Sequence, residues 1–134
     1  METRRNLKEE YLRQSVMTAT PSELLVMLYD GCIRNLKLAE LAMEEPADYM
    51  KVNERMVKAQ KIISELIGSL DMSYEISTQL LPIYDYLLRT LRTMNVKKDL
   101  SQLPAVLEIL KAQRDTWEQV SLASGGETGR QACI

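Results

Sequence analysis

Residues 17–43 read MTATPSELLVMLYDGCIRNLKLAELAM, and this stretch decides the fold of the chain. It opens with a helix N-terminal signal, in which Thr20 is the N-cap, Pro21 takes the first helical position and Glu23 follows three residues after the cap. In such a capping box the threonine hydroxyl accepts from the Glu23 amide, while the Glu23 carboxylate reaches back to the Thr20 amide. Pro21 suits the first turn because its missing N–H would have no partner there. The stretch therefore predicts a long helix starting at Pro21.

This predicted helix is apolar on two sides. Residues at three- and four-residue steps form a stripe that predicts a core face, and a second apolar set lies well to one side of it. The first set is Leu25, Leu28, Tyr29, Cys32, Leu36, Ala39 and Met43; the second is Leu24, Met27, Leu38 and Leu41, with Gly31 in the same sector. A glycine inside a helix costs about 1 kcal/mol relative to alanine, and close approach of another backbone would account for it. From this stretch alone, burial of both faces within one fold is favoured over contact with a second chain.

Two further helices follow with similar patterns. The second begins after the break at Glu44–Pro46, with Asp48 as its N-cap, and the third begins after Ser73 as its N-cap. Their predicted core stripes are Val52, Met56, Ala59, Ile63, Leu66 and Leu70, and then Ile76, Leu80, Ile83, Tyr84, Leu87, Leu91 and Met94. Pro82 interrupts the third helix and predicts a kink or two helical pieces, because proline removes one intrahelical hydrogen bond.

A fourth helix is predicted after Asp99, which we interpret as its N-cap, although Pro104 leaves open a later start. Its apolar side is formed by Leu100, Leu103, Val106, Leu107, Leu110 and Trp117. Arg114 lies beside Trp117 in this pattern and is predicted either to stack on the indole or to pair with a carboxylate.

Four amphipathic helices with short connections predict an all-α fold, an antiparallel up-down four-helix bundle with a short N-terminal helix or arm. We assign residues 1–17 to the N-terminal arm, 18–122 to the bundle and 123–134 to a disordered tail that contains the linker-like run Ser-Gly-Gly-Glu-Thr-Gly. The arm carries an apolar cluster that includes Tyr11, Val16 and Met17.

Composition excludes several classes of function. The chain of 134 residues contains no histidine and only two cysteines, so His-ligated haem, di-iron centres, phosphohistidine chemistry and a Cys-only zinc site are not expected. No serine or cysteine has a histidine to activate it. We therefore expect a protein that is not an enzyme and binds no cofactor or metal.

The charge and hydropathy of the chain indicate which partners and which cellular location to expect. The formal net charge is −2 and no basic run exceeds two residues, so nucleic acid is not an expected partner. A signal peptide and a long uncharged apolar run are both lacking, which predicts a cytoplasmic protein without stable membrane insertion.

The order and spacing of several short blocks resemble the flagellar secretion chaperone family FliS. Together they cover roughly residues 11–120. The blocks are Tyr11, Ser15–Pro21, Glu23–Leu25, Met27–Cys32, Lys58–Ile63, Ser69–Asp71, Tyr84–Tyr86, Asn95–Asp99 and Arg114–Trp117. Each block alone is weak evidence, but the whole set is specific.

This resemblance implies a cytoplasmic chaperone that binds the disordered C-terminal segment of flagellin. Such a chaperone prevents premature polymerisation and delivers its client to the flagellar type III export gate. The client would fold as helices in apolar grooves of the bundle. The resemblance also implies that an anti-sigma factor or a flagellin-binding regulator is a further partner of some family members.

We assign client binding to two groups of residues in the bundle and to the arm. Leu24, Met27, Gly31 and Leu38 are expected to supply a groove on the first long helix, and Leu81 and Leu88 part of its other wall. Tyr86 lies off the core stripe of its helix and is equally consistent with client binding and a structural role. The resemblance implies that the arm residues Tyr11, Val16 and Met17 contact the client and the export gate.

A second hypothesis is a helical scaffold or regulatory protein of the flagellar system. It would act through self-association as a homodimer or through an anti-sigma factor. A stable dimer with no affinity for flagellin would favour this hypothesis.

Overall fold

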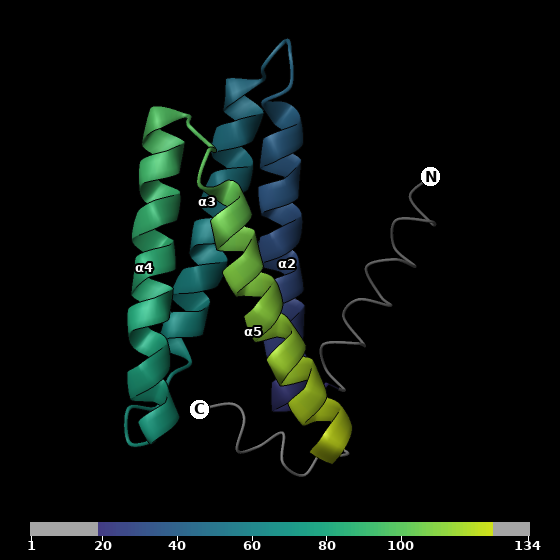
Figure 1. Ribbon diagram of the computed structural model, residues 1–134, viewed down its shortest axis with the longest axis vertical. Coiled ribbons are helices and arrows are strands. Elements are labelled where there is room, and N and C mark those ends of the chain that lie inside the picture. The colour runs from purple at the N-terminus through teal and green to yellow at the C-terminus, as the bar shows by residue number, and fades with distance from the viewer. Residues whose placement is uncertain (1–18, 125–134) are drawn as a thin grey trace, which may run out of the picture.

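The computed structural model describes residues 19–124, which form four long α-helices joined by short turns (Figure 1). The helices are α2 (Pro21–Ala42), α3 (Tyr49–Gly68), α4 (Glu75–Lys97) and α5 (Leu103–Ser124). Consecutive helices run in opposite directions, which confirms the predicted all-α, antiparallel four-helix bundle. The predicted arm at residues 1–17 lies outside the described residues. Helix α5 continues past residue 122, where the sequence predicted the bundle to end.

The four helices are not packed equally. Helix α2 packs against both α3 and α5, and α3 packs against α4, whereas within residues 19–124 the backbones of α4 and α5 hardly approach one another. Figure 1 shows α5 starting near the upper end of α4 and slanting away from it. The bundle therefore has a tightly packed α2–α3 side and, opposite to it, an open α4–α5 side.

The predicted core stripes of α2 and α3 are confirmed. Fully buried side chains alternate at three- and four-residue steps on each helix and meet in one cluster. From α2 these are Tyr29, Cys32, Leu36 and Ala39, and from α3 Val52, Met56, Ala59, Ile63 and Leu66. Trp117 also joins the core, as predicted. Burial of these apolar side chains is the main force that holds the helices together.

The helix starts agree with the sequence in two of four cases. Thr20 Oγ1 accepts from the Glu23 N–H at 3.3 Å, as predicted. The Glu23 carboxylate accepts from the Thr20 hydroxyl at 3.0 Å, where the sequence predicted a bond from the Thr20 amide. Asp48 caps α3 by accepting from the Lys51 N–H at 3.1 Å. Both N-caps satisfy amides that have no partner inside the first helical turn.

The other two predicted N-caps are wrong. Helix α4 begins after Tyr74, which makes no side-chain capping bond. Ser73 does not cap the helix, and its hydroxyl donates to Asp71 at 2.6 Å. Asp99 accepts from the Ser101 N–H in the turn before α5, and the helix starts only at Leu103, next to Pro104. Side chains that bond within a turn compete with helix capping, and the sequence pattern does not distinguish the two outcomes.

Two core predictions for α4 are wrong, and one of the two alternatives at Pro82 is excluded. The helix is continuous through Pro82, so it does not divide into two pieces. Ile76, predicted for the core, is 38% exposed, whereas Leu88, predicted to lie off the core, is only 8% exposed and belongs to the core cluster. The buried side of α4 therefore includes Leu88 and leaves out Ile76, so it lies further around the helix axis than the predicted stripe.

Candidate functional site

The α2 residues predicted to bind a client lie together along the α2–α3 side. Met27 is 37% exposed, and Leu24, Gly31 and Leu38 are half-buried. The α3 side chain nearest to Gly31 is Ile62, which is half-buried. These residues form a partly exposed, mainly apolar strip along α2, which we call the α2 strip and define as Leu24, Met27, Gly31 and Leu38.

Hydrogen bonds connect α3 to α2 beside this strip. Arg55 on α3 donates to the Asn35 side chain at 3.3 Å, and Asn35 in turn donates to the Gly31 carbonyl at 2.8 Å. This chain of hydrogen bonds ties α3 to the middle of α2.

Gly31 is not required by the packing of the bundle. A Cβ atom built at Gly31 would lie 3.4 Å from Ile62 Cδ1, which is an ordinary van der Waals contact. Beyond α2 itself, no backbone atom of the described chain comes within 4 Å of that position. A glycine inside a helix costs about 1 kcal/mol of helix stability relative to alanine. Neither steric crowding nor helix propensity therefore explains why a glycine occupies position 31.

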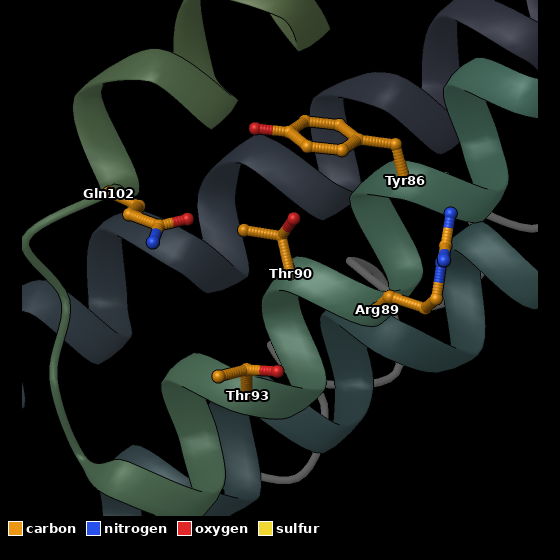
Figure 2. Close-up of a pocket in the computed structure, with 5 residues that line it drawn as sticks. All are labelled: Tyr86, Arg89, Thr90, Thr93 and Gln102. Atoms are coloured by element: carbon orange, nitrogen blue, oxygen red, sulfur yellow. The ribbon is translucent and has the colours of Figure 1, made fainter.

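The α4 residues predicted to bind the client do not complete a groove with α2. Leu88 lies in the core, and Leu81 is half-buried. Tyr86 is 46% exposed but lines a hollow with Gln102, on the open α4–α5 side (Figure 2). The structure therefore brings the four α2 residues together and places Tyr86 on another side of the bundle. Tyr11, Val16 and Met17 lie outside the described residues.

The α4–α5 side carries two hollows that the sequence pattern did not predict, one mainly polar and one mainly apolar. Figure 2 shows Tyr86, Arg89, Thr90 and Thr93 projecting from α4, with Gln102 facing them across one hollow of about 340 Å³. A second hollow, of about 300 Å³, is lined by Arg92, Val96, Lys97 and the shared Thr93. The basic character of this side could have been predicted from the segment between Asp85 and Asp99, which contains four basic residues and no acidic one.

The interior between α2 and α4 holds a pair of tyrosines. The Tyr29 and Tyr84 hydroxyls are hydrogen-bonded at 2.5 Å, with ring centroids 6.5 Å apart. Burial raises the pKa of the Tyr29 and Tyr84 phenols above the ordinary value for tyrosine. At Tyr29, the nearby Tyr84 side chain raises the pKa further. Burial also raises the pKa of the nearby Cys32 thiol to about 12, so this thiol is a poor nucleophile. This cluster is structural.

Arg114 pairs with carboxylates, which decides between the two roles left open by the sequence. Its Nε donates to Asp30 on α2 at 2.8 Å, and its Nη1 to Asp115 at 3.2 Å and to Glu118. Hydrogen bonds to Asp30 and Asp115 raise the pKa of the Arg114 guanidinium further above its ordinary value. The contact with Asp30 links α5 to α2, on the side away from α4.

Two classes of feature are absent from the part of the chain that the structure describes. Residues 19–124 contain no group of three Cys, Asp or Glu side chains arranged to hold a metal ion. In the same range, no helix has both the length and the apolar character needed to cross a bilayer.

An all-α bundle with an apolar surface strip fits the class of helical proteins that bind other protein segments. The comparisons with known proteins narrow this class. The family model described as flagellar protein FliS matches residues 4–124. The flagellar secretion chaperone FliS of Bacillus subtilis is 41% identical over 109 residues, which cover 81% of each chain. The Salmonella typhimurium protein of the same name is 34% identical over 113 residues, covering 82% of this chain and 83% of its own.

The chain therefore belongs to the FliS family of flagellar secretion chaperones. This confirms the resemblance found in the sequence.

Proposed function

We propose that this protein is a cytoplasmic export chaperone for flagellin. It binds the disordered C-terminal segment of the flagellin monomer, prevents premature polymerisation and delivers the monomer to the flagellar type III export gate. Membership of the FliS family supports this proposal at the level of class. The arm residues Tyr11, Val16 and Met17 are proposed to take part in contacts with the client and the export gate.

The observation that carries the proposal is the α2 strip. It exposes Met27 beside a glycine that the packing of the bundle does not require. A client side chain or backbone lying over Gly31 would use the space that a Cβ would otherwise fill. Leu24 and Leu38 lie about 21 Å apart along α2 at 1.5 Å per residue, which matches a client helix of about four turns.

The physical chemistry of coupled folding agrees with an apolar strip. A disordered client loses conformational entropy when it is ordered, so the contact must bury enough apolar surface to offset that cost. An amphipathic helix placed on the strip would bury its own apolar face and the exposed Met27 side chain together. Release by handover at the export gate requires no nucleotide hydrolysis.

The test is the substitution Met27→Asp, with Met50→Asp as the matched control. Met50 is 85% exposed in the first turn of α3 and lies outside the strip, so the control introduces the same charge on the same residue type. Calorimetric titration with the C-terminal segment of flagellin from the same organism is expected to show at least tenfold weaker binding for Met27→Asp, because a carboxylate is desolvated at the contact. Met50→Asp should bind as the unmodified chain does.

Circular dichroism of each variant alone verifies the fold, and circular dichroism of the mixtures reports helix formed on binding. If folded Met27→Asp binds the segment as tightly as the unmodified chain, the α2 strip is not the client site. If the unmodified chain does not bind the segment at all, flagellin is not the client.

A further inference from the structure

The exposed face of α4 is strongly basic in a chain that is acidic overall. Arg89, Arg92, Lys97 and Lys98 follow within ten residues, with no carboxylate between Asp85 and Asp99, whereas the whole chain has a formal net charge of −2. We call Arg89, Arg92, Thr93, Val96 and Lys97 the α4 basic face. These five positions fall within one side of the helix at about 100° per residue.

Internal ion pairs do not use all of these charges. Arg89 pairs with Asp85 at 3.0 Å, and Lys98 donates to the Asn95 carbonyl at 2.6 Å and to its side chain at 2.8 Å. Arg92 and Lys97 are exposed and form no ion pair with any residue in the described range 19–124. The charge of Arg92 is therefore available to a partner, whereas that of Lys97 is partly balanced by Asp99, whose pKa is lowered by hydrogen bonds from Ser101 and also by Lys97.

Helix stability explains only part of this arrangement. Cations near a helix C-terminus interact favourably with the helix dipole, which accounts for Lys97 in the last turn. That effect decays within one turn, so it does not account for Arg92, which lies five residues earlier.

Shape and apolar exposure add to the charge. Arg92, Thr93, Val96 and Lys97 line a hollow of about 300 Å³, and Val96 is 83% exposed at its surface. Helix α5 does not cover this face, because α4 packs against α3 and hardly approaches α5 within residues 19–124. An aliphatic side chain between two unpaired cations suits a ligand that combines carboxylates with an apolar group.

We propose that the α4 basic face is a second docking site, which binds an acidic segment of a partner protein. The segment would place carboxylates against Arg92 and Lys97 and an apolar side chain against Val96. From Arg89 to Lys97 the face spans about 12 Å, which fits four extended residues or two turns of helix. This face lies on the opposite side of the bundle from the α2 strip, so a segment bound here would not overlap the strip.

A protein segment fits this face better than nucleic acid does. Phosphate backbones bind many clustered cations and are disfavoured by the net negative charge of this chain. Two unpaired cations around one exposed valine form a small mixed site, of the kind found at polar and apolar protein interfaces.

The test uses the full chain and the synthetic peptide Glu-Leu-Glu-Glu-Leu-Glu, blocked at both ends. The variant is R92E/K97E, and the matched control is K37E/K111E, which reverses two exposed cations on α2 and α5 and gives the same net charge. Binding at low ionic strength is expected to weaken at least tenfold for R92E/K97E and less than twofold for K37E/K111E. Amide chemical-shift changes in the unmodified chain should fall between Tyr86 and Lys98.

Ligand controls distinguish the alternatives. The peptide with glutamine in place of each glutamate should bind at least tenfold more weakly, because the cations then lack their counter-charges. The proposal is overturned if both charge-reversal variants lose affinity equally, if the glutamine peptide binds as well, or if shifts map outside α4. It is also overturned if a single-stranded oligonucleotide or vesicles of anionic lipid bind at this face while the acidic peptide does not.

Discussion

The two sides of the bundle differ in packing, charge and surface chemistry. On the α2–α3 side the helices pack closely, the surface strip is apolar around Met27, and the polar rim is formed by the Asn35–Arg55 contact. On the α4–α5 side the backbones diverge, and the exposed face of α4 is basic and polar. One small bundle can therefore present two chemically different surfaces, because each helix buries only one stripe in the common core.

The largest expected difference between the sides is in stability. Leu66→Ala on α3 is expected to lower the free energy of unfolding by about 2–5 kcal/mol, because it opens a cavity in a fully buried site. Val96→Ala on α4 removes a side chain that is 83% exposed and should change stability by less than about 0.5 kcal/mol. Urea unfolding followed by circular dichroism measures both. Comparable losses for the two variants would show that the α4 face is covered in solution.

The tyrosine pair is expected to have the next largest effect, since it connects α2 to α4 across the core. Tyr84→Phe leaves the buried Tyr29 hydroxyl without its partner and should cost about 1–3 kcal/mol. Removing both hydroxyls in Y29F/Y84F should cost less than the sum of the two single substitutions, because no unpaired hydroxyl remains. A double-mutant cycle in urea gives the coupling. Strictly additive losses would argue against the hydrogen bond.

A smaller effect on stability than that of either core substitution is expected at Gly31. Gly31→Ala should raise the free energy of unfolding by up to about 1 kcal/mol, because alanine favours the helix and its Cβ meets Ile62 at an ordinary contact distance. The same substitution should weaken binding of the flagellin segment if the client lies over this position. Thermal unfolding and calorimetric titration separate the two effects. A loss of stability on Gly31→Ala would mean that the α2–α3 packing itself requires the glycine.

Much of the fold could be predicted from the sequence, because helix periodicity and capping are local. Thr20 and Asp48 were identified as N-caps, and the buried stripes of α2 and α3 follow directly from three- and four-residue spacing. The prediction failed where local alternatives compete. Ser73 and Asp99 bond within turns rather than capping helices, and Leu88 replaces Ile76 in the core.

The candidate site was predicted less completely. Periodicity separates Met27 from the core stripe, but it gives no information on which neighbouring helix lies beside it. Leu24, Met27, Gly31 and Leu38 lie on one sector of α2, and their role in client binding stays a prediction. The proposed wall from Leu81 and Leu88 on α4 is not formed with α2. Helix α4 packs against α3, and within the described chain it has no extensive packing with α2.

The sequence by itself determined the helices, most of the core and membership of the FliS family, because each of these depends on residue spacing along one chain. Only the tertiary structure decided that α4 and α5 diverge, that Arg114 reaches Asp30, and that the α2 strip and the α4 basic face lie on opposite sides. The physical reason is that helix pairing depends on how side chains from distant segments fill a shared interior, which periodicity within one helix does not specify.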